Sequence, residues 1–244
     1  MARGQTRRVP LRDLVRRRWT GWDETAIESA IGAGEVVVEG RILTNPAARV
    51  PIDAPLRHDP HARLAGQAKL EWALARFGVV ARDVVALDVG ACTGGFTSAW
   101  LAAGARRVYA VDAGHGQLLG SLRLDPRVVN LERTNVGDLS SALVPEPPGA
   151  VSVDVSYLSL QAAVAQLGSV ALASAAELLG LVKPMFELRL ATIPSDAATL
   201  ARARDEAVAG IAASGWEVRD AAESPLRGGR GAIEFFVHAV KTGH

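Results

Sequence analysis

The chain has 244 residues, 49% of them hydrophobic, and a formal net charge of +1 at pH 7. This length allows one large domain, or a large and a small one, with a sizeable buried core. The single cysteine, Cys92, excludes an internal disulfide framework and a multi-cysteine metal cluster, so we expect no metal site.

No apolar run reaches the roughly 18 residues that a membrane span needs. The best candidate, residues 170–182, is too short and contains Glu177. The arginine-rich N-terminal segment lacks the apolar stretch of a secretory signal. We therefore expect a cytoplasmic protein with no membrane partner.

Positive charge is concentrated near the N-terminus, where seven arginines and one aspartate fall within the first 18 residues. Such a cluster can neutralise the phosphates of a nucleic acid, and a solvated basic tail explains it equally well. The candidate phosphate contacts are Arg3, Arg7, Arg8, Arg16, Arg17 and Arg18.

The first sixty residues predict a small α+β unit. Apolar residues recur at helical spacing in 10–31, with a break at Gly21. Residues 35–43 are typical of two short strands around a turn, and four prolines in 45–60 indicate loop or edge structure. We expect a helix–helix–hairpin domain over residues 1–58 and a linker over residues 59–68.

Beyond the linker, strand and helix patterns alternate. The predicted strands are 84–89, 107–111, 128–131, 150–155, 177–182, 216–219 and 233–240. The predicted helices are 95–103, 116–123, 160–175 and 197–213. This alternation predicts an α/β domain over residues 69–244, built on a doubly wound and mostly parallel sheet.

A glycine-rich turn follows the first of these strands, with the spacing Asp88-x-Gly90-x-x-x-Gly94-Gly95. Glycines allow a sharp turn and a close approach of the backbone to a ligand. The next strand ends at Asp112, where a carboxylate can accept hydrogen bonds from both hydroxyls of a ribose. Strand, turn, helix, strand and acid in this order predict a nucleoside site, and a tight turn without a ligand is the alternative.

The spacing is not Gly-x-Gly-x-x-Gly, and no lysine follows the glycines as in a phosphate-binding loop, so a dinucleotide or nucleotide triphosphate is disfavoured. The motif instead resembles the first motif of class I methyltransferases, which implies S-adenosyl-L-methionine as cofactor. Asp138 is placed to reach an adenine edge, or to cap a helix, and Cys92 is expected to fill space in the turn. The expected cofactor-binding residues are Asp88, Gly90, Ala91, Cys92, Thr93, Gly94, Gly95, Phe96, Asp112, Ala113, Asn135, Val136, Asp138 and Asp154.

Lysine is rare in this chain, which contains only Lys69, Lys183 and Lys241 among its 27 basic residues. Arginine is always charged and cannot act as a base, whereas a desolvated lysine can lose its proton. Lys183 and Asp154 end neighbouring predicted strands, at the edge where such sheets bind ligands. This position makes both residues candidates for catalysis.

The catalytic candidates are therefore Lys69, Asp154, Lys183 and Glu234. Two lysines with two acids suit methyl transfer to a hydroxyl, because a ribose hydroxyl is a very weak acid that needs a base beside it. A lysine made less basic by a neighbouring cation can take the proton while the acids orient the ammonium groups. The alternatives are a solvated linker residue for Lys69 and structural acids for Asp154 and Glu234.

Several stretches resemble the TlyA, or hemolysin-A-like, family of rRNA 2′-O-methyltransferases. They are Ala86–Thr97, Val108–Asp112 with Gly116–Leu118, Leu122–Val128, Glu132–Asn135, Asp154–Ser159, Leu181–Glu187, Ser224–Pro225 and Glu234–Phe235. The resemblance covers nearly the whole chain. It implies an S-four-type RNA-binding domain joined to an FtsJ-like, Rossmann-like class I methyltransferase domain. It also places Lys69, Asp154, Lys183 and Glu234 on a catalytic Lys-Asp-Lys-Glu tetrad.

Two segments depart from the family pattern. The family usually has Ser-Arg-Gly-Gly-x-Lys-Leu before the first motif, whereas this chain has Leu64-Ala-Gly-Gln-Ala-Lys-Leu70. A Gly- and Lys-rich loop after Glu187 is replaced by Leu188-Arg-Leu-Ala-Thr-Ile193. The first expectation is methylation of a ribose 2′-hydroxyl in rRNA or ribosomal subunits. The alternatives are a small-molecule methyltransferase with a degraded RNA site, and a non-enzymatic RNA-binding protein.

Overall fold

The structure is a computed structural model that describes residues 7–60 and 62–242, so Arg3 lies outside the described residues. The helices are α1 Leu11–Arg18, α2 Glu24–Gly32, α3 Ala65–Phe77, α4 Gly95–Ala102, α5 Gly120–Leu124, α6 Leu160–Ala165, α7 Pro184–Glu187 and α8 Ala197–Ala213. The strands are β1 Arg8–Pro10, β2 Val36–Val38, β3 Arg41–Ile42, β4 Arg49–Pro51, β5 Leu56–His58, β6 Val85–Val89, β7 Arg107–Asp112, β8 Val128–Glu132, β9 Ala150–Val153, β10 Glu177–Val182, β11 Trp216–Glu223 and β12 Phe235–Lys241.

Seven strands form the central sheet in the order β11-β12-β10-β9-β6-β7-β8. The five strands from β10 to β8 are parallel, and β12 runs antiparallel to both β10 and β11. The chain leaves β6 toward β7 on one side and returns to β9 on the other. The strand order therefore reverses beside β6, and ligands of open α/β sheets bind at the carboxyl ends of the strands at such a point.

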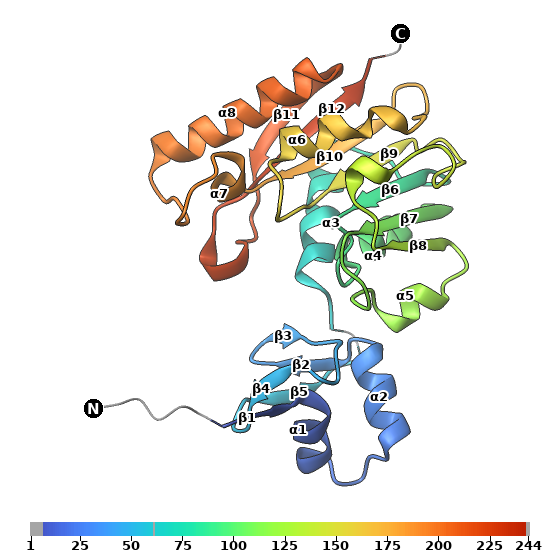
Figure 1. Ribbon diagram of the computed structural model, residues 1–244, viewed down its shortest axis with the longest axis vertical. Coiled ribbons are helices and arrows are strands. Elements are labelled where there is room, and N and C mark those ends of the chain that lie inside the picture. The colour runs from blue at the N-terminus through green and yellow to red at the C-terminus, as the bar shows by residue number, and fades with distance from the viewer. Residues whose placement is uncertain (1–6, 61, 243–244) are drawn as a thin grey trace.

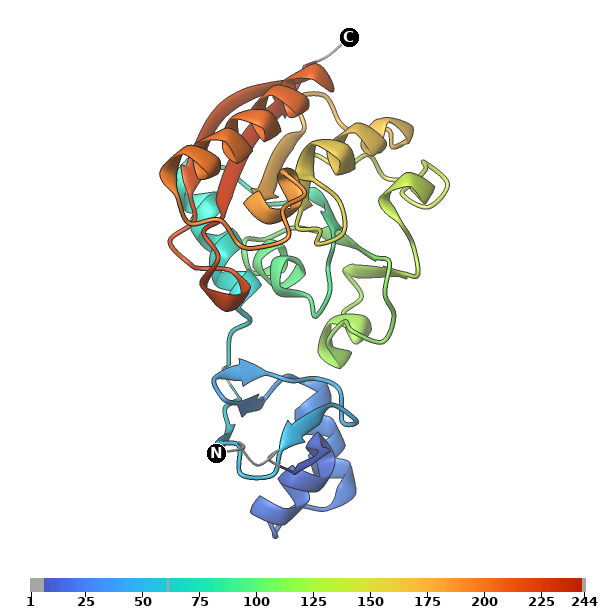
Figure 2. The ribbon, with the colours of Figure 1, turned by 60° about the vertical axis from the view of Figure 1, so that its left-hand side comes forward.

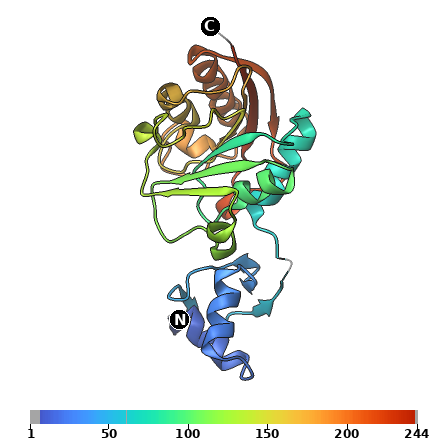
Figure 3. The same ribbon diagram turned by 90° about the vertical axis from the view of Figure 1, so that its right-hand side faces the viewer.

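Helices cover both faces of this sheet, as the predicted alternation requires. Apolar residues of α3 and α4 pack on one face and those of α6 and α8 on the other, so alternate residues of each strand are buried on opposite sides. Figure 3 shows the strands between the α3–α4 layer, in cyan and green, and the α6–α8 layer, in yellow and orange. This three-layer arrangement confirms the Rossmann-like class predicted from the sequence.

Residues 7–60 pack around a separate apolar cluster formed by α1, α2 and three short strands, including Leu11, Leu14, Ile27, Ile31 and Val36. Figures 1 and 2 both show this blue unit as a lobe beside the larger one, joined to it by the segment that leads into α3. The lobes touch where α2 ends, because the position of a Cβ on Gly34 lies 2.9 Å from a methyl group of Leu119.

The structure corrects two expectations about local structure, the helix over 160–175 and the linker over 59–68, and agrees with the edge structure expected for residues 45–60. The helix predicted over residues 160–175 ends at Ala165 and is followed by a short 3-10 turn, because Ala173 N donates to Pro148 O instead of a helical carbonyl. Helix α3 begins at Ala65, within the predicted linker. The proline-rich segment 45–60 contains the edge strands β4 and β5.

Candidate functional site

The glycine-rich turn between β6 and α4 folds tightly over the carboxyl end of the sheet. Gly90 and Gly94 have φ values of 90° and 97°, a region that favours glycine. A Cβ on Gly90 would lie 2.3 Å from the Asp154 carbonyl oxygen, and one on Gly94 would lie 2.1 Å from a methyl of Leu122. The turn therefore requires glycine at both positions, and the second contact fixes it against α5.

Asp88 anchors this turn from below rather than facing solvent. Its buried carboxylate accepts hydrogen bonds from Thr97 Oγ1 at 2.7 Å and Ser152 Oγ at 2.9 Å, and Trp100 Nε1 donates to Ser152 Oγ. Burial raises the pKa of Asp88 to about 7, against the opposing effect of the Thr97 and Ser152 hydrogen bonds. The geometry gives Asp88 a supporting position under the turn.

The end of β7 lies beside the turn, as the motif order predicted. Asp112 Oδ2 accepts a hydrogen bond from Cys92 N at 2.8 Å, and its Oδ1 accepts one from Gly114 N at 2.7 Å. Each carboxylate oxygen has a second acceptor site, so Asp112 retains capacity for two ribose hydroxyls. Ala113 is exposed next to it.

The other residues expected around the cofactor lie in the same turn and in the next loop. Ala91 and Phe96 are buried, and Thr93 O accepts a hydrogen bond from Leu119 N. In the loop after β8, Asp138 Oδ2 accepts from Asn135 N at 3.3 Å and from Asn135 Nδ2 at 3.2 Å, while Val136 is buried. Asp138 therefore caps the short 3-10 helix Val136–Asp138 and remains exposed.

Tyr157 lies beside the loop after β8, and the sequence analysis did not assign it a role. It is 52% exposed and follows β9 by four residues. The pKa of its phenol is raised by burial and by the charges of Asp112 and Asp138, and is opposed by a hydrogen bond with the Val136 backbone. The phenol thus lies close to both acids expected to hold the nucleoside.

Asp154 and Lys183 meet at the carboxyl ends of β9 and β10. Lys183 Nζ lies 2.5 Å from Asp154 Oδ1 and donates a hydrogen bond to Ser156 Oγ at 2.7 Å. Asp154 Oδ1 is buried and accepts no hydrogen bond within the described residues, so the contact is an ion pair without hydrogen-bond alignment. Strand β10 ends at Val182, Lys183 is the N-cap of α7, and Pro184 is the first residue of that helix.

Lys69 and Glu234 form the second pair, across 165 residues of sequence. Lys69 Nζ donates to Glu234 Oε2 at 2.5 Å, and both side chains are at most 10% exposed. Lys69 is held by α3, whose first turn contacts α4 so closely that a Cβ on Gly66 would lie 3.3 Å from Gly95 Cα. Glu234 is enclosed by the preceding loop, where a Cβ on Gly228 would lie 2.1 Å from Glu234 Oε1.

Two cavities lie beside the Lys183–Asp154 pair. One, of about 380 Å³, is lined by Asp154, the residues from Gly90 to Thr93 and the start of α3. The other, also of about 380 Å³, is lined by Lys183 and Glu234 together with apolar residues that include Met185, Phe186 and Ile193. The Lys183–Asp154 pair therefore stands between the glycine turn and the cavity that Glu234 also lines.

The candidate phosphate-binding arginines do not form one uniform patch. Arg16 forms ion pairs with Asp13 and Glu24, so much of its charge is balanced locally. Other guanidinium groups bind backbone oxygens: Arg8 donates to Arg49 O at 2.6 Å, and Arg18 donates to Ile52 O at 3.5 Å. Arg7 and Arg17 are exposed.

Glu187 is a further buried acid beside the site, and the sequence analysis did not identify it as a functional residue. Its carboxylate accepts hydrogen bonds from Leu160 N at 2.7 Å and Gln161 N at 3.4 Å, which tie α7 to the start of α6. Burial raises its pKa, against these hydrogen bonds. The sequence signal that could have identified Glu187 is an acid three residues after Pro184. The helix that contains it has four residues, which is too short to be recognised from periodicity.

The model of the FtsJ-like methyltransferase family matches residues 64–241. The 16S/23S rRNA (cytidine-2′-O)-methyltransferase TlyA of Mycobacterium tuberculosis is 36% identical over 234 residues, which cover 92% of this chain and 87% of that protein. Hemolysin A of Brachyspira hyodysenteriae is 31% identical over 221 residues, covering 87% of this chain and 92% of that protein.

Solved structures of proteins described as hemolysins also resemble this chain. A protein described as a hemolysin from Streptococcus thermophilus superposes with a TM-score of 0.73 at 29% identity, covering 97% of this chain and 90% of that one. A similarly described protein from Lactococcus lactis has a TM-score of 0.69 at 34% identity, covering 73% and 88%. No helix among the described residues is long and apolar enough to cross a membrane.

The resemblance drawn from the sequence motifs is thus confirmed over most of the chain. The central sheet has the same fold in more distant methyltransferase structures, such as one from Listeria monocytogenes with a TM-score of 0.54 at 16% identity. The chain belongs to the FtsJ-like methyltransferase family and is an S-adenosylmethionine-dependent methyltransferase.

Proposed function

We propose that this enzyme transfers a methyl group from S-adenosylmethionine to a ribose 2′-hydroxyl of rRNA. The observation that carries the proposal is the placement of two lysine–carboxylate pairs, Lys183–Asp154 and Lys69–Glu234, at the edge of the sheet that holds the glycine turn. The name of the Mycobacterium tuberculosis relative, an rRNA (cytidine-2′-O)-methyltransferase, supports the same substrate.

The residues at this edge fit the cofactor. The turn at Gly90 leaves no space for a side chain and brings backbone close to Asp154. Asp112 retains acceptor capacity for ribose hydroxyls, and Asp154 lines the same cavity as the glycine turn. When bound, S-adenosylmethionine supplies a methyl group on a sulfonium centre, which is already activated for transfer.

The chain's own chemistry is then mainly alignment and removal of one proton. Lys183, in its neutral form, accepts the proton of the 2′-hydroxyl, and Asp154 and Ser156 orient its amine. Lys69 is held in a buried position at the same edge of the sheet by its ion pair with Glu234. Holding the hydroxyl in line with the methyl group supplies most of the remaining rate.

We further propose that residues 1–58 form the RNA-binding domain, residues 59–68 the connection, and residues 69–244 the catalytic domain. Arg7 and Arg17 are exposed and can meet phosphates, whereas Arg16 is already paired with acids. A ribosomal substrate places the enzyme in the cytoplasm.

A second candidate function is methylation of a small molecule. It is favoured by the apolar wall of the cavity beside Lys183, formed by Met185, Phe186, Ile193 and Pro194. Such a wall accepts a flat apolar acceptor without any contribution from the small lobe.

Methyl transfer from radiolabelled S-adenosylmethionine separates the two functions. The proposal expects label on ribosomal subunits or rRNA, located at 2′-oxygens by resistance of the neighbouring phosphodiester to alkaline cleavage. Label found only in a metabolite extract, with none on ribosomal RNA, would establish the small-molecule function instead. Lys183→Ala serves as the inactive control.

A further inference from the structure

A cavity of the described residues lies far from the catalytic edge. It has a volume of about 780 Å³ and is bounded by α6, the segment 170–175, the end of α8 and the last residues of β12. Its floor is the cross-strand pair Trp216 and Lys241, at the start of β11 and the end of β12. This edge is opposite the carboxyl ends of the parallel strands, so the cavity is separate from the site described above.

Lys241 is the third lysine of the chain, and the proposed reaction gives it no role. Lys69 and Lys183 each face a carboxylate within 2.5 Å, whereas the described residues give Lys241 no carboxylate partner. Its Nζ donates to Ser214 O at 3.1 Å and lies 5.2 Å from the centre of the Trp216 ring. An ammonium group has three N–H donors, so donors remain for a ligand.

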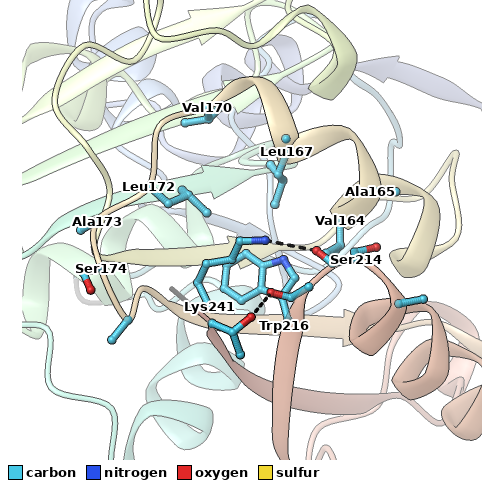
Figure 4. A pocket seen from close by; sticks show the side chains of 15 residues that line it. Val164, Ala165, Leu167, Val170, Leu172, Ala173, Ser174, Ser214, Trp216 and Lys241 are labelled. Carbon is cyan, nitrogen blue, oxygen red and sulfur yellow. Dashed lines mark hydrogen bonds between the residues drawn. The ribbon is translucent and has the colours of Figure 1, made fainter. Parts of the chain in front are cut away.

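One wall of the cavity beside this ammonium group is apolar. In Figure 4, Lys241 lies across the middle of the cavity, with Leu167, Val170 and Leu172 on one side and Trp216 on the other. No acidic residue is among those that line the cavity. A cation that has no carboxylate partner among the described residues, next to an apolar wall, favours a ligand that has both a negative charge and an apolar body.

We propose that this cavity is a second binding site, which takes a small carboxylic acid with an apolar body. The carboxylate accepts hydrogen bonds from Lys241 Nζ, and the apolar body packs against Leu167, Val170 and Leu172. The inference does not rest on the proposed methylation reaction, and the two can fail separately.

The test is an NMR titration of the full-length protein with hexanoate, using 1-hexanol as a neutral probe with the same apolar chain. Wild type is expected to bind hexanoate about tenfold more tightly than hexanol, because a charge-assisted hydrogen bond contributes roughly one factor of ten. The shifted resonances should include the Trp216 indole. Equal affinity for both probes, or no binding of hexanoate, would overturn the proposal.

Two variants show whether Lys241 carries the preference. Lys241→Met keeps an unbranched apolar stem of similar length, removes the charge, and should reduce the hexanoate preference to about one. Because Lys241 also binds Ser214 O, Ser174→Glu provides a variant that leaves this contact intact. The exposed Ser174 lines the cavity, so a carboxylate there should pair with Lys241 and weaken hexanoate at least about tenfold, while Ser174→Gln binds as wild type. A preference that survives in both Lys241→Met and Ser174→Glu would also overturn the proposal.

Discussion

Lys183 Nζ lies 2.5 Å from Asp154 Oδ1 yet donates its hydrogen bond to Ser156 Oγ, at 2.7 Å. Charge therefore holds the lysine beside the aspartate, while the serine sets the direction of the amine. The carboxylate and the serine hydroxyl together fix the position of the amine that we propose as the base.

Replacing Lys183 should separate chemistry from cofactor binding. In Lys183→Ala, turnover should fall by at least about a hundredfold, the lower range for a general base, while cofactor affinity changes by less than about threefold. Single-turnover methyl transfer and calorimetry measure the two quantities. Full activity of the folded variant would rule out the proposed base.

Ser156 offers a gentler test of the same geometry. Ser156→Ala removes the group that directs the Lys183 amine without removing the base. We expect kcat to fall by about tenfold, the effect of one hydrogen bond of roughly 1.4 kcal/mol, with KM for RNA unchanged. Ser159→Ala is a matched control, because Ser159 caps α6 through Ala162 N and does not contact Lys183. A similar loss in both variants would indicate only general destabilisation.

Asp112 should contribute to cofactor affinity. Asp112→Ala removes one or two hydrogen bonds to a neutral ribose, each with about 0.5–1.5 kcal/mol, so affinity should fall between about twofold and a hundredfold. Because Asp112 also binds Cys92 N and Gly114 N, Asp112→Asn, which keeps one acceptor oxygen, should lose less affinity than Asp112→Ala. Calorimetry measures the affinity of both folded variants for S-adenosylmethionine. An affinity equal to that of wild type would mean that the nucleoside binds elsewhere.

Asp88 should make the stability of the protein depend on pH. Its pKa in the folded protein is about 7, above the unfolded value near 3.8, so the folded state binds the proton more tightly. The contribution of Asp88 to the free energy of unfolding is complete below about pH 4 and is lost as the pH rises toward about 7. The free energy falls by on the order of 1.4 kcal/mol per pH unit at most. In Asp88→Asn, the free energy of unfolding should depend less on pH in this range.

Urea unfolding between pH 5 and pH 8 measures this effect as the difference between wild type and variant. Asp205→Asn, at an exposed position of α8, is the control and should follow the wild-type curve. If Asp88→Asn shows the same pH dependence as wild type, the carboxyl is ionised in the folded protein throughout this range.

RNA binding should depend on Arg7 and Arg17, which are exposed on the small lobe. The double variant Arg7→Ala/Arg17→Ala should reduce the slope of log affinity against log salt by about 1.4–1.8, from 0.7–0.9 for each phosphate contact. Arg202→Ala on α8, where the arginine pairs with Glu206, is the control. Binding that is weak at low salt and insensitive to the double substitution would contradict an RNA substrate.

The sequence predicted the central sheet well because its strands are buried apolar runs separated by clear turns. Strand 177–182 and helix 197–213 were predicted with their observed bounds. Helix 160–175 was predicted too long because tertiary hydrogen bonds, from Ala173 N to Pro148 O and from Ala171 N to Ser141 Oγ, replace the helical ones. Periodicity carries no information about such distant partners.

The candidate site shows the same limit. The glycine turn and Asp112 are local motifs, and their contact follows directly from the order of strands. The pairing of Lys69 with Glu234 spans most of the chain, and neither residue's neighbours in the sequence reveal it. The ion pair of Arg16 with Glu24 likewise forms only when α1 and α2 are packed together, which a count of arginines does not reveal.

The conformation of the glycine turn gives the protein a natural chemical reporter. Cys92 is the only cysteine in the chain, lies exposed at a φ of 48°, and touches Gln117 through its thiol. Burial of the thiol raises its pKa, so alkylating reagents should label it slowly at neutral pH and faster under alkaline conditions. A ligand that occupies the turn should shield this one sulfur, so the labelling rate measures occupancy without any engineered tag.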